Sequence, residues 1–117
     1  MSNKSWTIRR FRTAQFVVKL ECEYEDEPDL FWADQETLDK INSGEWGCYM
    51  FSVHVLHNGC VIGSDYLGGL VYADPADFAT EHRGEKLGSY FSDMVRTAIA
   101  EARAELAKPR PYIRTAA

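Results

Sequence analysis

Alternation of apolar and polar residues is the clearest pattern in the first part of the chain. Between residues 14 and 24 the even positions are apolar or aromatic, and the odd positions are mostly polar. A period of two predicts a strand that buries one face. The same pattern reaches back to Trp6, but Arg10 and Arg12 interrupt its apolar side. We therefore expect a bend or bulge near these arginines, before the regular strand at residues 14–24.

A β-hairpin is predicted over residues 49–72, where Asn58 and Gly59 separate two runs of strand-forming residues. Both turn residues accept the positive φ of a type I′ turn, which matches the twist of the paired strands. Counting outward from the turn gives a register whose pairs on one face are His57 with Cys60, Val55 with Ile62, Val53 with Ser64, Phe51 with Tyr66, and Tyr49 with Gly68. This face is the richer in aromatic and β-branched residues, so we assign it to the core. Gly68 and Gly69 predict a bulge or tight bend in the second strand.

Capping signals and a helical period predict three helices. Asp34 is a good N-cap for a short helix over residues 35–41, after a charged loop interrupted by Pro28. Asp74 followed by Pro75 predicts a second short helix that ends at Gly84. The main helix is predicted over residues 89–107, because one stripe at i, i+3, i+4 and i+7 collects Phe91, Met94, Val95, Ala98, Ile99, Ala102 and Leu106. Prolines at positions 109 and 111 should stop it.

Together these elements predict an α+β fold. We expect an antiparallel sheet of three or four strands, with the long C-terminal helix packed on one face and two short helices in the connections. The helix would be about 28 Å long, close to the length of a nine-residue strand, so it can cover one face of the sheet. We expect a single domain over residues 1–117, with loose termini at 1–5 and 109–117.

Composition narrows the class of protein. Hydrophobic residues make up 45% and charged residues 26% of the chain, which is typical of a globular domain. No apolar run approaches the roughly 20 residues that span a bilayer, and the first ten residues lack the apolar region of a signal peptide. We therefore expect a cytoplasmic protein with no membrane contact. Cys22, Cys48 and Cys60 form no C-x-x-C pair, so reduced and buried side chains are expected.

Charge is distributed unevenly along the chain. Residues 1–20 hold five basic residues and no acid, whereas residues 21–45 hold ten acids and one lysine. The overall charge of -5 therefore hides a strongly acidic segment. Such a segment repels nucleic acid and attracts basic proteins. We do not expect direct nucleic-acid binding from this chain.

Ser52, His54 and Asp65 share one face of the hairpin in the counted register, with Ser52 opposite Asp65. These residue types suggest a hydrolase triad. That chemistry needs a nucleophile on a strained turn and an oxyanion hole, which flat sheet positions do not supply. The polar outer face of a half-exposed sheet explains the three residues equally simply. We therefore predict no catalytic residues, and a small enzyme using His54 and Asp65 is the alternative.

Metal and phosphate sites are weakly indicated. His54 and His57 lie three residues apart on one strand, so they point to opposite faces, and His57 with Cys60 supplies only two zinc ligands. The glycine segment at residues 63–69 matches neither of the usual phosphate-binding spacings. We predict no metal and no cofactor, although a nucleotide-binding module using this segment belongs to the alternative hypothesis.

The acidic segment is the candidate partner-binding surface. If its first two glutamates share the solvent face of their strand, they extend the loop carboxylates into one negative surface, which could occupy the nucleic-acid groove of a partner. A solvated surface that only aids solubility is the competing interpretation. The candidate partner-binding residues are Glu21, Glu23, Glu25, Asp26, Glu27, Asp29, Trp32, Asp34 and Glu36.

A family resemblance adds a context. Residues 51–72 follow the pattern F-x-V-x-V-x-x-x-G-x-x-I-G-x-D-x-L-G-G-x-x-Y, and residues 88–103 read GSYFSDMVRTAIAEAR. Together they resemble small accessory proteins encoded by bacteriophages, prophages and other mobile elements. Proteins of that size and acidity include anti-CRISPR and other anti-defence inhibitors, which work by binding. The resemblance covers about half the chain and assigns no functional residues.

Three hypotheses about function follow. The first is a non-enzymatic cytoplasmic binding protein, which would inhibit a host defence complex by occluding it or by mimicking nucleic acid. Its partner would be a protein, in particular a host nucleic-acid-binding complex. The second is the small enzyme or nucleotide-binding module described above. The third is self-association, for example as a homodimer, through an exposed strand edge or aromatic patch.

Overall fold

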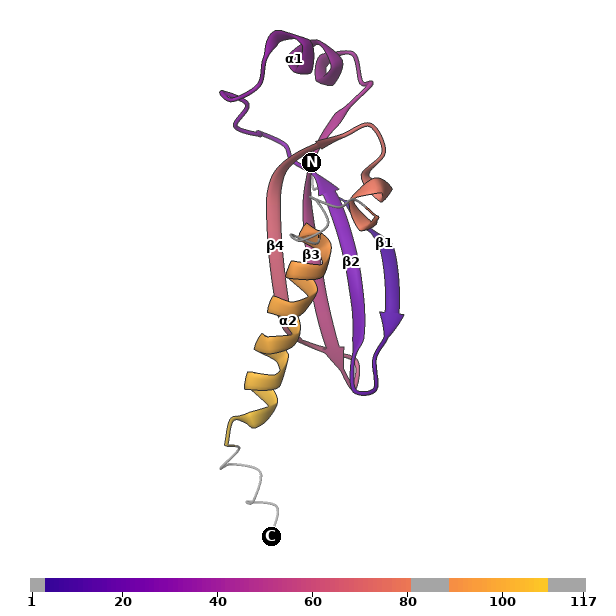
Figure 1. Cartoon of the computed structure of the whole chain (residues 1–117), viewed down its shortest axis with the longest axis vertical. Coiled ribbons are helices and arrows are strands. Elements are labelled where there is room, and N and C mark those ends of the chain that lie inside the picture. The colour runs from indigo at the N-terminus through magenta and orange to yellow at the C-terminus, as the bar shows by residue number, and fades with distance from the viewer. Residues whose placement is uncertain (1–3, 81–88, 110–117) are drawn as a thin grey trace.

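The computed structural model describes residues 4–80 and 89–109 of the chain. In this part, four antiparallel strands form one sheet in the order β1-β2-β3-β4 (Figure 1). The elements in chain order are β1 (Ser5–Arg12), β2 (Val17–Tyr24), α1 (Gln35–Asn42), β3 (Gly47–His57), β4 (Cys60–Tyr72), the 3₁₀ helix η1 (Pro75–Ala79) and α2 (Tyr90–Ala107). The predicted α+β architecture is confirmed, with the sheet, the C-terminal helix and the short connecting helices all present.

The N-terminal alternation comprises two strands separated by a turn. Thr13 N–H donates to the Phe16 carbonyl (2.8 Å), and Phe16 N–H donates to Thr13 Oγ1 (3.0 Å), which closes the turn between β1 and β2. The expected irregularity lies at Ile8, where the register shifts between Thr7 and Arg9. After this bulge the odd positions of β1 face the core, because Phe11 pairs with buried Val18. The bulge thus explains why arginines seemed to interrupt the apolar face.

The predicted loose termini fall mainly outside the described residues. Residues 1–3 and 110–117 belong to that part, as does the predicted end of the second short helix at Gly84. Ser5 was expected to be loose, but it begins β1 and pairs with Glu23. The second short helix begins at Pro75 as predicted, with Asp74 accepting the Ala76 N–H at 3.0 Å, but it is a 3₁₀ helix that ends at Ala79.

The hairpin turn is correct, but the predicted register fails at the third pair from the turn. Asn58 and Gly59 have φ values of 52° and 82°, as a type I′ turn requires. Beyond the turn, Ile62 is bulged, so that Val55 pairs with Gly63. The pairs that follow are therefore shifted by one from the counted ones, and this applies to His54 with Ser64, Val53 with Asp65, Ser52 with Tyr66, and Phe51 with Leu67.

Close packing of α2 explains that bulge. The shift turns Gly63 toward the helix, where a Cβ on it would lie only 2.1 Å from the Ala98 carbonyl oxygen. Without the bulge, Ser64 would occupy a position on this face. The second irregularity, at Gly68 and Gly69, is where the sequence predicts it, and Gly69 has a φ of 76°.

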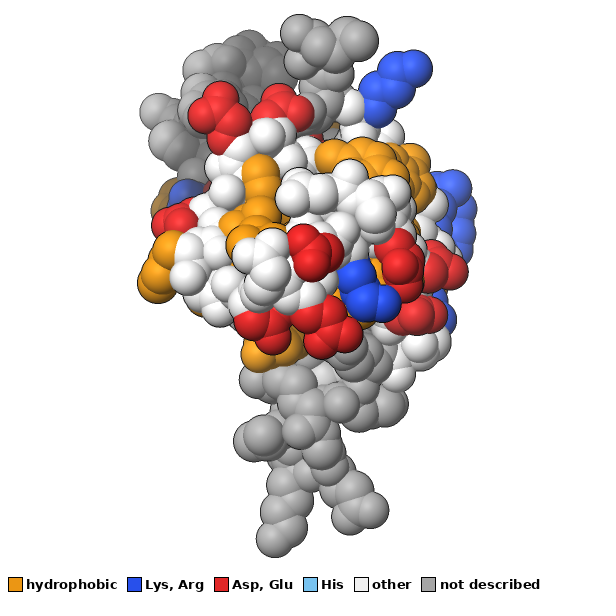
Figure 2. Space-filling model, turned by 90° about the horizontal axis from the view of Figure 1, so that it is seen from above, with side chains coloured by type: hydrophobic (Ala, Val, Ile, Leu, Met, Phe, Trp, Pro, Cys, Tyr) orange, Lys and Arg blue, Asp and Glu red, His pale blue; other side chains and the backbone are white. Residues whose placement is uncertain are grey.

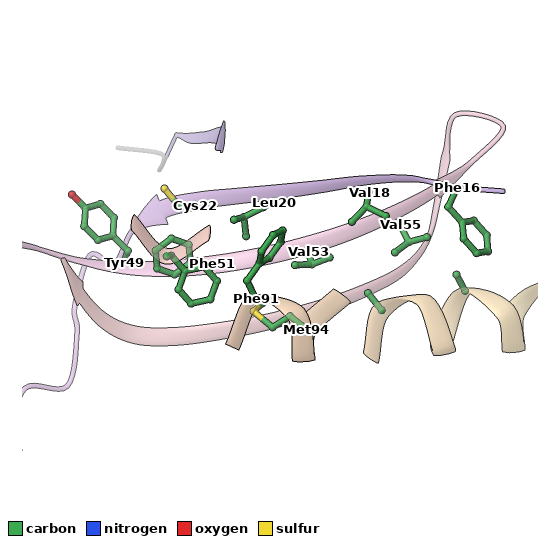
Figure 3. Packing of buried hydrophobic residues seen from close by; sticks show 13 residues of the cluster. Phe16, Val18, Leu20, Cys22, Tyr49, Phe51, Val53, Val55, Phe91 and Met94 are labelled. Atoms are coloured by element: carbon green, nitrogen blue, oxygen red, sulfur yellow. The ribbon is translucent and has the colours of Figure 1, made fainter. Parts of the chain in front are cut away.

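The core lies between the sheet and α2. Figure 3 shows buried side chains of β2 and β3, among them Leu20 and Phe51, beside Phe91 and Met94 of α2. The helix begins after Ser89, whose hydroxyl accepts the Ser92 N–H, and it buries the predicted stripe. Phe78 of η1 closes one end by stacking on Phe51, with ring centroids 4.0 Å apart. The opposite sheet face carries no described helix (Figure 1).

Helix α1 depends on its N-cap. Asp34 accepts the Thr37 N–H at 2.8 Å, and this bond lowers the pKa of the Asp34 carboxyl. Because the folded pKa is below the unfolded one, the cap is complete above the ordinary pKa of aspartate and is lost as pH falls through the lowered value. The α1 helix should therefore keep its cap in mild acid and fray only below the ordinary pKa of aspartate.

Replacing Asp34 with alanine should loosen α1 without unfolding the sheet. We expect amide hydrogen exchange at Thr37 and Leu38 to accelerate roughly fivefold at neutral pH, because the cap acceptor is lost. Asp34→Asn keeps an acceptor and is the matched control, with exchange close to that of the native protein. Equal exchange in the alanine and native proteins would contradict a capping role.

Candidate partner-binding surface

The connection between β2 and β3 projects beyond the end of the sheet (Figure 1). We call residues 25–46 the α1 lobe. It contains α1, and all eight residues of α1 are described, none of them fully buried. The lobe is ordered by hydrogen bonds more than by burial: Trp46 N–H donates to the Lys40 carbonyl (3.0 Å), and Glu25 N–H donates to the Cys48 carbonyl (3.0 Å). It is therefore a defined projection with little core of its own.

Two adjacent aromatic side chains are exposed in this lobe. Phe31 is 87% exposed and Trp32 is 51% exposed. Local bonds fix the backbone around them, since Trp32 Nε1 donates to the Asp29 carbonyl (3.0 Å) and Phe31 N–H donates to Asp29 Oδ1 (3.3 Å). The sequence prediction included Trp32 but missed Phe31. The sequence could have indicated Phe31, because it stands next to Trp32 in a loop that is otherwise rich in charged residues.

Carboxylates lie around these aromatics. Asp26, Glu27 and Glu36 are exposed, and Figure 2 shows acidic side chains interspersed with hydrophobic ones at this end of the molecule. The single lysine of residues 21–45 is Lys40, whose Nζ lies 2.9 Å from Glu45 Oε2. That hydrogen bond raises the pKa of Lys40, so its charge stays paired within the lobe. The surface is therefore strongly negative.

Some of the predicted contact residues have structural roles instead. The Glu25 carboxylate accepts the Gly69 N–H and ties the lobe to β4. Asp34 caps α1, and Asp29 holds the turn that presents the aromatics. These three acids position the surface, so replacing them would disturb the lobe as well as its charge.

The two glutamates of β2 share the outer sheet face, since they alternate with buried Leu20 and Cys22. Glu23 lines a hollow of about 210 Å³ with Asp26 and Met50, so it extends the negative surface of the lobe onto the sheet. Glu21 lies two residues further from the lobe, 3.6 Å from Lys19 Nζ and 3.7 Å from His54 Nε2. Both glutamates therefore share one face, as the predicted surface requires, and the charge of Glu21 is paired there with Lys19.

A cavity of about 440 Å³ opens where the lobe meets the sheet. Its described lining residues come from the end of β2, the lobe, the start of β3 and the residue after β4, and they are Tyr24, Glu25, Asp26, Pro28, Ile41, Gly44, Trp46, Gly47, Cys48, Tyr49 and Ala73. Burial and a hydrogen bond to Tyr24 raise the pKa of the Tyr49 hydroxyl far above its ordinary value, so Tyr49 is a neutral phenol at any physiological pH.

The outer sheet face carries a different set of polar residues from the predicted triad. His54 Nδ1 lies 2.8 Å from Ser64 Oγ, and its Nε2 faces Glu21. The prediction that placed Asp65 opposite Ser52, on the same face as His54, is wrong, because the bulge at Ile62 pairs Asp65 with Val53 on the core side. Ser64 of β4, His54 of β3 and Glu21 of β2 thus link the three strands across the outer face.

This arrangement is poorly suited to nucleophilic catalysis. Ser64 lies in a regular strand pair, and its N–H donates to Glu101 Oε1 at 3.0 Å. The backbone donor nearest the hydroxyl is therefore already engaged. An oxyanion hole needs donors aimed at the developing charge.

The bond from the Ser64 N–H to Glu101 also has a structural consequence. Glu101 and Glu25 together occupy two N–H groups of the β4 edge strand and protect it from pairing with another chain.

Metal and cysteine chemistry find little support in the geometry. Within residues 4–80 and 89–109, no three His, Cys, Asp or Glu side chains are grouped as a metal site. Cys22 and Cys48 are buried as expected, and burial raises the pKa of Cys22 to about 11. Cys60 was expected to be buried, but it is exposed at the hairpin turn. The glycines of residues 63–69 serve packing and bends, as Gly63 and Gly69 show.

Comparisons with protein-family models, curated proteins and solved structures give no match for this chain. Among the helices of the described ranges, none combines the length and the apolar character needed to cross a bilayer. The function is therefore inferred from the geometry of the α1 lobe and from the sequence itself.

Proposed function

We propose that this chain is a non-enzymatic cytoplasmic binding protein that engages a protein partner through the α1 lobe. The main support is Phe31, which is 87% exposed on a turn held by a hydrogen bond to Asp29, within a strongly acidic segment. Because the rings of Phe31 and Trp32 stay exposed in the folded lobe, folding of the chain alone gains little hydrophobic free energy from them. Burying each ring against a partner would contribute about 2–3 kcal/mol. Aromatic anchors inside a polar rim are the usual anatomy of a protein interface.

The charge of the lobe favours a partner with a basic groove. Residues 25–46 hold eight acids and one lysine, which would steer association with a basic surface and repel acidic ones. Proteins that bind nucleic acid carry such grooves. The resemblance to phage accessory proteins gives this a context, in which the partner is a host defence complex and the lobe occludes its nucleic-acid site.

Charge reversal tests this proposal. Glu27→Lys with Glu36→Lys changes two exposed acids that lie outside the hydrogen bonds of the lobe turn. The partner is first isolated by affinity capture from the host and identified by mass spectrometry. We expect the double variant to bind it about 100-fold more weakly at low salt, a loss of about 3 kcal/mol. Native binding should weaken steeply with added salt, and the variant should respond less.

A matched control separates local charge from net charge. Asp77→Lys with Glu105→Lys makes the same change in total charge on η1 and α2, away from the lobe. This control should keep native affinity within about threefold, since distant exposed charges are screened. If the lobe variant binds as tightly as the control, the acidic surface does not contact the partner and the proposal fails.

A further inference from the structure

The cavity between the lobe and the sheet has an unusual lining. Its described residues include two carboxylates, on Glu25 and Asp26, and the aromatic rings of Tyr24, Trp46 and Tyr49, but no lysine, arginine or histidine. The Glu25 carboxylate is fixed in place because it accepts the Gly69 N–H. Negative charge and aromatic surface thus meet in one hollow, and the negative charge is held by the backbone of a neighbouring strand.

This lining is complementary to a cationic organic group. Carboxylates attract the charge, and aromatic faces attract it through their quadrupoles while also covering its apolar parts. Trp46 already makes one such contact, since Lys40 Nζ lies 5.1 Å from its ring centroid. The neutral Tyr49 phenol adds apolar contact surface to the same hollow.

The dimensions and geometry favour a guanidinium group. A volume of about 440 Å³ is within the range of small-ligand sites and accommodates an arginine side chain. Guanidinium is planar, stacks on aromatic rings and pairs with carboxylates through two parallel bonds, whereas an ammonium acts as a point charge. A cavity lined by both aromatic rings and carboxylates can use both the stacking and the paired hydrogen bonds of a guanidinium.

We propose that this cavity is a specificity pocket for an arginine side chain of the partner protein. The inference rests on the proposed function for its occupant, because a partner bound at the lobe would bring its basic residues to a cavity that the lobe itself lines. The pocket itself is a property of the isolated chain. Its recognition chemistry can therefore be measured without the partner.

The test is a titration of the ¹⁵N-labelled protein with N-acetyl-arginine-N-methylamide, followed by NMR. The matched neutral probe is the citrulline analogue, which keeps the shape and loses the charge. We expect saturable shifts at the Trp46 indole and at Gly44 and Gly47, with a dissociation constant on the order of millimolar. The citrulline analogue should bind at least tenfold more weakly. Equal binding of both probes, or no saturable shift with arginine, would overturn the proposal.

Variants connect the binding to the carboxylates. Glu25→Gln with Asp26→Asn removes both charges, and the glutamine keeps an acceptor for the Gly69 N–H. We expect this variant to bind the arginine probe at least tenfold more weakly, and Asp26→Asn alone to show the same direction if the double variant is unfolded. Asp77→Asn with Glu105→Gln, which removes two charges elsewhere, should bind like the native protein. Equal affinity in all of these variants would overturn the proposal.

The outcome is distinguishable from that of the proposed function. If the probe binds but lobe variants keep native partner affinity, the pocket is real and its occupant is not that partner. If the partner binds through the lobe but the arginine probe gives no saturable shift, the pocket is wrong and the interface stands.

Discussion

Replacing Gly63 with alanine should cost the protein about 3 kcal/mol or more of its free energy of unfolding. The added Cβ would lie 2.1 Å from the Ala98 carbonyl oxygen and 2.8 Å from the Ala102 backbone nitrogen. Both atoms belong to the backbone of α2, which cannot yield as a flexible side chain would. The helix must therefore move away from the sheet and open the core around Met94. Urea denaturation followed by circular dichroism measures the loss.

The same substitution five residues further along β4 is the matched control. A Cβ on Gly68 would meet only the terminal atoms of the Glu25 side chain, the nearest at 3.0 Å, and this flexible side chain needs to move by only a few tenths of an ångström. We expect Gly68→Ala to change the free energy of unfolding by less than about 1 kcal/mol. If Gly63→Ala is as stable as Gly68→Ala, then the close approach of α2 to β4 is not what holds the helix.

Removing the two exposed aromatics of the lobe should abolish most of the partner affinity. Phe31→Ala with Trp32→Ala deletes both anchors, and two central anchors are worth about 4 kcal/mol together, or roughly 1000-fold in the dissociation constant. The free energy of unfolding should change by about 1 kcal/mol, because Phe31 is 87% exposed and Trp32 contributes one hydrogen bond, to the Asp29 carbonyl. Biolayer interferometry against the captured partner measures the affinity, and circular dichroism measures the stability.

Exposed aromatic and apolar residues elsewhere provide the comparison. Val61 and Tyr66 are 55% and 58% exposed on the outer sheet face, at a distance in sequence from the lobe. Val61→Ala with Tyr66→Ala removes a similar kind of surface and should leave the affinity unchanged. The reverse pattern, with binding lost in this variant and kept in the lobe variant, would move the interface to the outer sheet face.

Much of the fold could be predicted because its signals are local. Asp34 and Ser89 are caps that act within one helical turn, and Asn58 with Gly59 specifies a two-residue turn by φ alone. The stripe of α2 needs only a period of 3.6 to be recognised. These features depend on neighbours in sequence, so they are readable without knowing the tertiary structure.

Two other features were missed because tertiary packing decides them. The turn at residues 13–16 was not recognised because Trp6 and Phe16 are both apolar residues at even positions and seemed to belong to one strand. The bulge at Ile8 moves the core-facing residues of β1 to odd positions, so that β1 and β2 pair as two strands. The bulge at Ile62 exists because Gly63 must face α2. A one-residue shift exchanges the two faces of a strand. Here the cross-strand partner of His54 is Ser64 and not the predicted Gly63.

The site was only partly predictable for a similar reason. Composition located the acidic segment, but it could not tell which carboxylates are engaged by the backbone. Glu25 reaches across to Gly69, 44 residues away in sequence, and Glu21 turns to the outer face with His54. The exposure of Phe31 depends on where the lobe projects from the sheet, which no local pattern reports.

Parallel affinity capture from the host tests whether the α1 lobe binds the partner. The baits are the native protein, the lobe variant Phe31→Ala with Trp32→Ala, and the sheet-face variant Val61→Ala with Tyr66→Ala, and the captured proteins are quantified by mass spectrometry. We expect a partner that the native and sheet-face baits enrich equally and that the lobe variant fails to enrich. Equal enrichment of that partner by all three baits would contradict binding through the α1 lobe.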